Sequence, residues 1–181
     1  MSVPTLRIEN LTLGFKTYAG MSDVLHGISL HISKGERVAL VGESGSGKSV
    51  TARIVLGMLQ QIKTARISGS VEFEGTDLQS LSPASRHALR GTKMSMIFQD
   101  PTSSLNPVFP IFTQFREVLA RAEPGITVER ARERAITALA DVSITEPDRV
   151  LDSYAFQLSG GMNQRVMISM ALANNPALLL A

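Results

Sequence analysis

The sequence has no cysteine, no tryptophan and only two tyrosines among its 181 residues. The absence of cysteine excludes disulfide bonds and thiolate metal sites. The three histidines, His26, His31 and His87, do not have the spacing of a metal-binding cluster. The stability of the chain must therefore come from a hydrophobic core, for which 44% apolar residues are sufficient.

Excess charge of one sign and long hydrophobic runs are also lacking. Lys and Arg number 18 against 16 Asp and Glu, which is too small a surplus to indicate a nucleic-acid-binding surface. The longest apolar runs, residues 166–173 and 177–181, are far shorter than the about 20 residues that cross a bilayer. Residues 1–10 lack the apolar stretch of a signal peptide. We therefore expect a globular chain in the cytosol that reaches a membrane only through a partner.

Alternating apolar and polar residues predict two antiparallel strands at the start of the chain. They cover residues 6–15 and 24–32, and residues 16–23 between them are typical of a loop. A short apolar run predicts a further strand at residues 37–41, before a helix from Lys48 to about Leu59. The remaining predicted elements are strands at 70–74, 94–98 and 177–181, a helix capped by Ser82 and Pro83 that ends near Leu89, a surface helix built on Val128, Ala131, Ala135, Leu139 and Val142, and a helix from Gly160 to about Ala173.

A glycine-rich segment at residues 42–49 fits the pattern G-x-x-x-x-G-K-S at every fixed position, between a predicted strand and a predicted helix. Glycines allow the backbone N–H groups to point inward, and the helix start presents its positive end to an anion. A flexible Gly/Ser loop is the alternative, but the flanking strand and helix favour a phosphate site. Lys48 should reach the β- and γ-phosphates, and the Ser49 hydroxyl should bind Mg²⁺. The residues predicted to hold the nucleotide here are Gly42, Glu43, Ser44, Gly45, Ser46, Gly47, Lys48, Ser49 and Val50.

A phosphate-binding loop alone does not separate a transport ATPase from a GTPase or a small-molecule kinase. The segment Leu158-Ser159-Gly160-Gly161-Met162 lies directly before a predicted helix and offers a second helix N-terminus to an anion. Taken alone, it could be an ordinary capped loop. In combination with the first motif it resembles the ABC ATPase family, whose signature is LSGGQ or, in the peptide-importer branch, LSGGM followed by Gln-Arg, here Gln164-Arg165.

The resemblance covers almost the whole chain. It implies an α/β P-loop NTPase (ABC ATPase) core with an antiparallel β subdomain and an α-helical subdomain at about 105–160, all within one nucleotide-binding domain over 1–181. In that family two subunits face head to tail, and the signature of one closes over the nucleotide in the loop of the other. The residues implied for this role are Ser159, Gly160, Gly161, Met162 and Gln164.

Two further matches rest on the resemblance. Phe98-Gln99-Asp100-Pro101 resembles the family's Q-loop, which implies that Gln99 contacts Mg²⁺ and the attacking water and senses the membrane partner. Phe15 matches the position of the aromatic residue that stacks on adenine, with Tyr18 as a rival and core packing as the alternative. The chain departs from the branch at Tyr154-Ala155-Phe156-Gln157, where Tyr-Pro-His-Gln is usual, and at Asn163, whose place a basic residue often takes.

The resemblance implies the ATP-binding subunit of an importer for a peptide-like solute, peripheral on the cytoplasmic side of the cell membrane. Its cofactors would be ATP and Mg²⁺. Its partners would be a second ABC ATPase subunit, transmembrane permease subunits and, indirectly, an extracytoplasmic solute-binding protein. In the family an Asp and a Glu follow the strand that corresponds to 177–181, so we expect this chain to be truncated and to hydrolyse ATP poorly or not at all.

Three alternatives remain at this stage. The first is a non-hydrolysing nucleotide-binding remnant of such a subunit. The second is a P-loop kinase or GTPase, against which the segment at 158–162 argues. The third is a soluble ABC ATPase without a transporter, which usually joins two cassettes or carries large insertions, and neither is found in this sequence.

Overall fold

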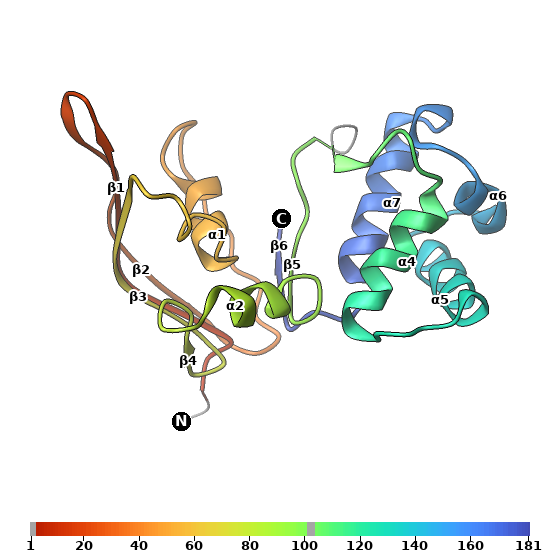
Figure 1. Cartoon of the computed structure of the whole chain (residues 1–181), viewed down its shortest axis with the longest axis horizontal. Coiled ribbons are helices and arrows are strands. Elements are labelled where there is room, and N and C mark those ends of the chain that lie inside the picture. The colour runs from red at the N-terminus through yellow and green to blue at the C-terminus, as the bar shows by residue number, and fades with distance from the viewer. Residues whose placement is uncertain (1–2, 101–103) are drawn as a thin grey trace. The chain divides into compact units, whose positions relative to one another are not determined.

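The computed structural model describes residues 3–100 and 104–181. They belong to two compact units, Met1–His87 and Ala88–Ala181. The first unit contains an antiparallel sheet and helix α1, and the second contains a pair of parallel strands and helices α4 to α7 (Figure 1). This combination of an antiparallel sheet with a helical region agrees with the predicted fold class.

The antiparallel sheet has the strand order β2-β1-β3-β4. Strands β1 (Leu6–Thr17) and β2 (Gly20–Ile32) form a hairpin in which Leu6 lies opposite Ile32 and Thr17 opposite Gly20. Strand β3 (Ala65–Phe73) pairs with the other edge of β1, and β4 (Thr76–Asp77) pairs with β3. The apolar face of this sheet is buried, through side chains that include Leu6, Ile8, Leu11, Leu13, Leu25, Val71 and Phe73.

The predicted loop at residues 16–23 is wrong, because the hairpin continues almost to its tip. The Thr17 hydroxyl donates a hydrogen bond of 2.8 Å to the Gly20 carbonyl, and every side chain from residue 16 to residue 23 is exposed. Backbone pairing therefore holds this part of the hairpin without a buried face. Strand β3 likewise starts at Ala65, well before the predicted residue 70.

The predicted strand at residues 37–41 is also wrong. No strand forms there in the part of the chain that the structure describes, and Val38, Leu40 and Val41 are 46%, 46% and 90% exposed. A strand requires a neighbour for its backbone N–H and C=O groups, and the sheet of the first unit does not pair with this segment. An apolar run predicts a tendency to be buried but does not supply the partner.

Helix α1 (Lys48–Val55) is shorter than predicted because Gly57 ends it. Gly57 has φ of +70°, and its N–H donates to the Ile54 carbonyl while the N–H of Met58 donates to the Arg53 carbonyl. These two bonds are the Schellman pattern, in which a left-handed glycine closes a helix. Helix α2 (Pro83–Leu89) has the predicted bounds. The Ser82 hydroxyl caps it by accepting the Ser85 N–H at 3.1 Å.

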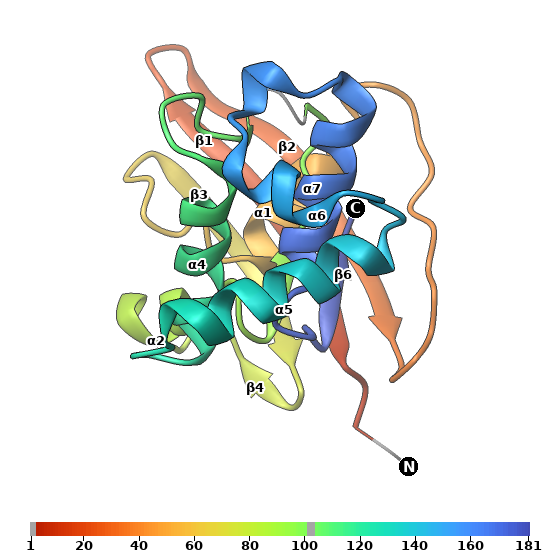
Figure 2. The ribbon, with the colours of Figure 1, turned by 90° about the vertical axis from the view of Figure 1, so that its right-hand side faces the viewer.

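The second unit contains strands β5 (Met94–Met96) and β6 (Leu178–Leu180), which run parallel. Strand β5 ends at Met96, two residues before the predicted boundary. Helix α5 (Val128–Asp141) lies across α4 (Ile111–Ala122) and α7 (Gly160–Leu172), as Figure 2 shows. The short elements α6 (Pro147–Asp152) and η1 (Ala155–Gln157) precede α7. Side chains that are completely or almost completely buried between these helices include Ile111, Phe115, Leu119, Ala131, Ala135, Leu139, Val150, Leu151 and Val166.

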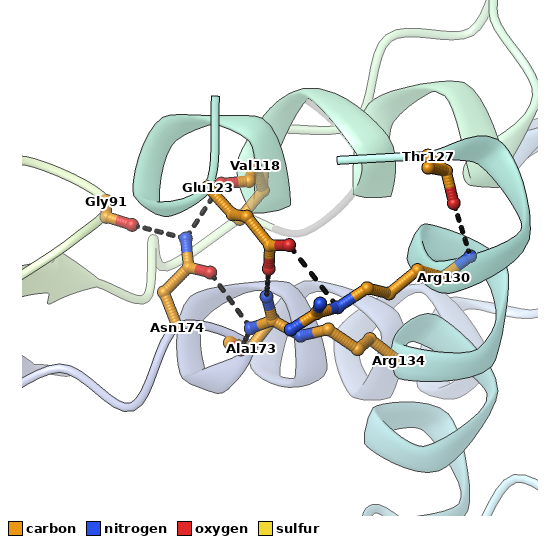
Figure 3. A network of polar contacts seen from close by, with 8 residues as sticks. All are labelled: Gly91, Val118, Glu123, Thr127, Arg130, Arg134, Ala173 and Asn174. Atoms are coloured by element: carbon orange, nitrogen blue, oxygen red, sulfur yellow. Dashed lines mark hydrogen bonds and ion pairs between the residues drawn. The ribbon is translucent and has the colours of Figure 1, made fainter. Parts of the chain in front are cut away.

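A network of polar contacts joins four segments of this unit (Figure 3). Arg134 of α5 donates to the Glu123 carboxylate at 3.3 Å and also to the Asn174 side-chain oxygen at 3.3 Å. The Asn174 amide nitrogen donates to the carbonyls of Gly91 and Val118, both at 2.7 Å. The network therefore links the end of α7 to α4, to α5 and to the turn before β5.

A second ionic contact joins α5 to α6, and we expect its contribution to the stability of the fold to depend on pH. Arg132 donates two hydrogen bonds to the Asp152 carboxylate, at 2.9 and 3.0 Å, and these hold the pKa of Asp152 below its ordinary value. A carboxyl whose pKa is lowered by folding stabilises the fold above its unfolded pKa of about 3.9, and this contribution is lost as the pH falls through the folded value. Asp152→Asn should therefore lower the free energy of unfolding at pH 7 by only about 0.2–1 kcal/mol, since the Asp152 side chain is 66% exposed and solvent screens the pair.

The measurement is urea unfolding followed by far-UV circular dichroism, at pH 7 and at a series of pH values below about 3.9, the ordinary pKa of an aspartate. The difference between the protein and Asp152→Asn should decrease steadily as the pH falls through this series. Asp141→Asn, at an exposed position of α5, is the matched control. A loss at pH 7 that is equal in the two variants would contradict the prediction.

Candidate functional site

The loop at residues 42–49 owes its shape to two glycines with left-handed backbone conformations. Gly45 has φ of +84° and Gly47 has φ of +93°, a region that favours glycine. Gly47 is the N-cap of α1 and lies against Leu25 of β2, so closely that a Cβ atom at Gly47 would overlap the Leu25 side chain. Because Leu25 is only 2% exposed, the core of the sheet fixes the end of the loop.

The Lys48 ammonium lies inside this loop. Its Nζ atom donates to the carbonyls of Gly42 and Glu43, both at 2.7 Å, and to the Ser46 hydroxyl at 3.3 Å. The loop thus wraps around a cation. In α1, all of which is described, the first turn carries no acidic side chain that would repel an anion, and the Ser49 hydroxyl group belongs to an exposed residue.

These features fit the phosphates of a nucleotide. The two left-handed glycines allow a tight backbone, the Lys48 charge lies at its centre, and the positive end of α1 begins at the same residue. A Cβ atom at Gly42 would lie 2.7 Å from the Ser46 hydroxyl oxygen, so the loop is also too tight there for a larger residue. The residues predicted from sequence to form the phosphate cradle, 42–50, are therefore brought together in the first unit.

Of the two aromatic residues considered for the base, Phe15 lies nearer to the cradle along the hairpin. Phe15 pairs with Ser22 of β2 and with Ala65 of β3, and its side chain is half-buried. Ser22 is three residues, about 10 Å, along β2 from Leu25, the residue that contacts Gly47. Tyr18 lies further away, in the turn that joins the two strands, and is fully exposed.

The second predicted motif forms the N-terminus of α7. The Ser159 hydroxyl accepts the Met162 N–H at 3.3 Å, which makes Ser159 the N-cap. Gly160 and Gly161 are exposed, and a Cβ atom at either would meet no atom within 4 Å. Gln164 is exposed one turn further along. The backbone N–H groups of Gly160 and Gly161, at the start of this helix, are therefore open to a ligand.

Asn163 of α7 fixes the segment that leads into this helix. Its side chain is 4% exposed, and its Nδ2 atom donates to the Ala155 carbonyl at 2.9 Å. Its Oδ1 atom is buried and has no hydrogen-bond partner among the residues described. Asn163 thus points into the interior, where it supports the loop that carries Ser159, and not toward the exposed N-terminus of α7.

A concavity of about 410 Å³ lies in front of the N-terminus of α7. One wall carries Ser159 and Arg165, and the other is formed by residues between Ser143 and Val150. The Arg165 guanidinium donates to the Ser143 carbonyl at 2.9 Å, and Arg149 donates to Glu146 at 2.9 Å. The second wall was not found from the sequence, because it consists of the turn after α5 and of α6, which are positioned by packing on α4 and α5 and carry no motif.

Gln99 follows β5 in the second unit and is exposed. Pro101, the last residue of the motif to which Gln99 belongs, lies outside the described residues. The structure therefore places the phosphate cradle in the first unit, and the signature residues and Gln99 in the second. Within residues 3–100 and 104–181, no cluster of acidic residues or histidines could hold a metal ion by itself. Among the helices described, none is long and apolar enough to cross a bilayer.

Known sequences match almost the whole chain. Residues 25–181 match the family described as ABC transporter. The oligopeptide transport ATP-binding protein OppD of Bacillus subtilis is 43% identical over 176 residues, which are 97% of this chain and 49% of OppD. The oligopeptide transport ATP-binding protein AppD of the same organism is 42% identical over 97% of this chain and 53% of AppD. The chain thus spans about half the length of the curated relatives it matches.

Solved structures show the same fold. The dimeric ATP-binding cassette MJ0796, in a post-hydrolysis state bound to ADP and Pi, has a TM-score of 0.80 and 28% identity over 96% of this chain and 72% of its own. CbiO1 from Clostridium perfringens, part of the ABC transporter complex cbiONQ, has a TM-score of 0.72 at 23% identity, over 98% of this chain and 64% of its own. The fold class predicted from the sequence, an ABC ATPase P-loop fold with an antiparallel sheet and a helical region, is thus confirmed. The chain belongs to the ABC transporter family and, within it, to the sequence group of the oligopeptide and peptide import ATP-binding proteins.

Proposed function

We propose that the protein is the ATP-binding subunit of an ABC importer, which couples the binding and hydrolysis of ATP to the uptake of a peptide-like solute. The observation that carries the nucleotide-binding part is the position of the Lys48 ammonium, 2.7 Å from two carbonyls of the glycine-rich loop. The names of the relatives, which are oligopeptide and peptide transport proteins, support the choice of solute.

In this proposal residues 42–50 hold the phosphates, with Lys48 against the β- and γ-phosphates. The Ser49 hydroxyl and Gln99 hold Mg²⁺, and the half-buried ring of Phe15 stacks on adenine. The bound nucleotide supplies the phosphoanhydride bond whose cleavage drives transport, and Mg²⁺ neutralises charge on its oxygens. The roles of the protein are to neutralise, position and shield these groups.

A second cassette would complete the site. We propose that Ser159, Gly160, Gly161, Met162 and Gln164 of a partner ATPase subunit close over the nucleotide. Support comes from the exposed N-terminus of α7, from the concavity in front of it, and from the dimeric form of MJ0796. Residues of about 105–160 would form the helical subdomain. Transmembrane permease subunits and, indirectly, an extracytoplasmic solute-binding protein would complete the transporter on the cytoplasmic side of the cell membrane.

Hydrolysis is proposed for the whole protein, because this chain spans about half the length of its relatives. For the 181-residue polypeptide alone we propose binding with slow hydrolysis or none. The proposed set contains one carboxylate, Glu43 of the cradle loop, and we assign none of its residues the role of general base. A positioned general base typically contributes a factor of about 10² to 10⁴ to a reaction rate.

Calorimetric titration of the purified chain with nucleotides tests the proposal. ATP and ADP should each bind at one site in the presence of Mg²⁺, and AMP should bind at least about tenfold more weakly because it lacks the phosphate that Lys48 reaches. Removal of Mg²⁺ with a chelator should weaken the binding of ATP more than that of AMP. An equal affinity for ATP and AMP would contradict the role of the cradle, and the absence of any ATP binding would overturn the proposal.

A further inference from the structure

A second concavity lies in the first unit, beyond the C-terminal end of α1 and therefore away from the phosphate cradle at its N-terminal end. Its volume is about 360 Å³, within the range of about 300–1,000 Å³ that is common for small-molecule sites. Its walls come from four segments of the chain: the loop after α1, the start of β3, the turn after β4, and α2. The polar side chains that line it are Gln60, Arg66, Gln79 and Arg86.

All four of these side chains are held in place by hydrogen bonds to backbone carbonyls. Gln60 donates to Ile54 at 2.8 Å, Arg66 to Lys63 at 2.9 Å, Gln79 to Gly69 at 3.0 Å and Arg86 to Leu78 at 3.3 Å. Side chains that are already restrained lose less conformational entropy when a ligand arrives. The polar lining of the pocket is therefore preorganised.

The pocket carries positive charge that the protein does not neutralise. No acidic side chain lines it, and neither Arg66 nor Arg86 forms an ion pair with any carboxylate in the described part of the chain. The bonds that hold the two arginines use the Nη1 atom of each, which leaves the Nη2 and Nε donors of both for a ligand. Two guanidinium groups with free donors suit an oxyanion, and above all a phosphate.

The end of α1 is shaped to accept one of these arginines. A Cβ atom at Gly57 would lie 3.1 Å from the Cδ atom of Arg86, so the glycine that closes the helix also leaves room for the arginine stem. The guanidinium is thereby kept near the negative end of the helix, where a cation is favourable. Arg86 is thus positioned by two local features, the Schellman glycine and the Leu78 carbonyl.

We propose that the pocket formed by Gln60, Arg66, Gln79 and Arg86 binds a phosphate monoester or inorganic phosphate, at a site distinct from the nucleotide cradle. The two arginines bind the phosphate oxygens, and the two amides contact the rest of the ligand. A phosphorylated small molecule and the headgroup of phosphatidic acid share this chemistry. The site does not depend on the function proposed above, because none of its residues belongs to the cradle.

The first test is a titration with inorganic phosphate, followed by the side-chain NMR signals of the arginines and glutamines. It is performed on the Lys48→Ala variant, so that the cradle does not contribute. The signals of Arg66 and Arg86 should shift in a saturable manner. Arg86→Gln or Arg66→Gln should weaken the binding at least about tenfold, whereas Arg37→Gln, an exposed arginine outside the pocket, should leave it unchanged. Arg86→Lys, which keeps the charge, should retain part of the affinity and controls for misfolding.

Equal phosphate affinities in the Arg37→Gln and Arg86→Gln variants would overturn the proposal. The proposal would also be overturned if the unmodified chain bound phosphate and the Lys48→Ala variant did not, because the phosphate would then lie in the cradle. A nucleotide titration of the unmodified chain remains informative in either case, so failure of this site is distinguishable from failure of ATP binding.

Vesicles identify the source of the phosphate. The chain is sedimented with vesicles of phosphatidylcholine, with or without phosphatidic acid. Binding to phosphatidic acid vesicles that Arg86→Gln abolishes would assign the pocket to a lipid headgroup. Binding of glycerol 3-phosphate in solution, without vesicle binding, would assign it to a soluble phosphomonoester. If neither ligand binds in a manner that depends on Arg86, the pocket is not a phosphate site.

Discussion

Replacement of Lys48 by alanine should weaken the binding of ATP by this chain by about one to two orders of magnitude, since a hydrogen bond to a charged group contributes about 1.5–3 kcal/mol. Lys48 lies at the centre of the cradle, where its ammonium contacts the carbonyls of Gly42 and Glu43. On binding, the ammonium exchanges these neutral acceptors for anionic phosphate oxygens, which are stronger partners. Without it, the loop retains its backbone donors but loses its cation.

The measurement is calorimetry with ATP on both proteins, and circular dichroism shows that the variant is folded. Lys34→Ala is the matched control, since Lys34 is an exposed lysine of the same unit outside the loop. Equal affinities of Lys48→Ala and Lys34→Ala for ATP would show that the loop is a glycine-rich turn without a role in phosphate binding. The alternative of a flexible Gly/Ser loop would then be correct.

The largest effect on stability is expected for Phe115→Ala. Phe115 is 0% exposed in α4 and belongs to the core that α4, α5 and α7 share. Truncation removes apolar contacts and leaves a cavity, which costs about 3–5 kcal/mol for a buried phenylalanine. Since whole domains are stable by only about 5–15 kcal/mol, the variant should unfold at a much lower urea concentration or remain unfolded.

Phe156→Ala is the matched control for this prediction. Phe156 is 72% exposed and stacks on Tyr154, with the ring centroids 5.5 Å apart. Its removal should therefore cost about 1 kcal/mol or less. Urea unfolding of the two variants, followed by far-UV circular dichroism, gives the comparison. Similar losses of stability in both variants would mean that the helical core is not packed as the structure describes.

The sequence predicts well those elements whose signal is local. The apolar spacing of α5 lies within that helix, and the capping residue of α7 directly precedes it. Both helices have nearly the predicted bounds. Val128 is an exception, because it fits the apolar spacing of α5 but is 45% exposed at the first turn. Helices α4 and α6 were not predicted as separate elements. Helix α6 gives little local signal, since it has only six residues and depends on packing against α5.

The prediction of the candidate site shows the same division. The cradle can be read from the sequence because its geometry depends on glycines and a lysine within eight consecutive positions. The second wall of the concavity at α7 cannot be predicted from the sequence, since Ser143 and Arg149 reach it only through the packing of separate helices. Periodicity likewise gives no signal for the tip of the β1–β2 hairpin, whose side chains are exposed on both faces. The segment at 37–41 shows the opposite error, in which an apolar run has no strand beside it.

The Asn174 side chain has a consequence for the order in which the chain folds. Its amide bonds to carbonyls that lie 83 and 56 residues earlier in the sequence. Contacts across such separations form only after the entropy of closing a long loop has been lost, whereas helices form locally and quickly. These bonds therefore close after α4 and α7 have met. An interaction that forms after the transition state slows unfolding without accelerating folding, so we expect Asn174 to affect how long the helical region stays folded and not how fast it folds.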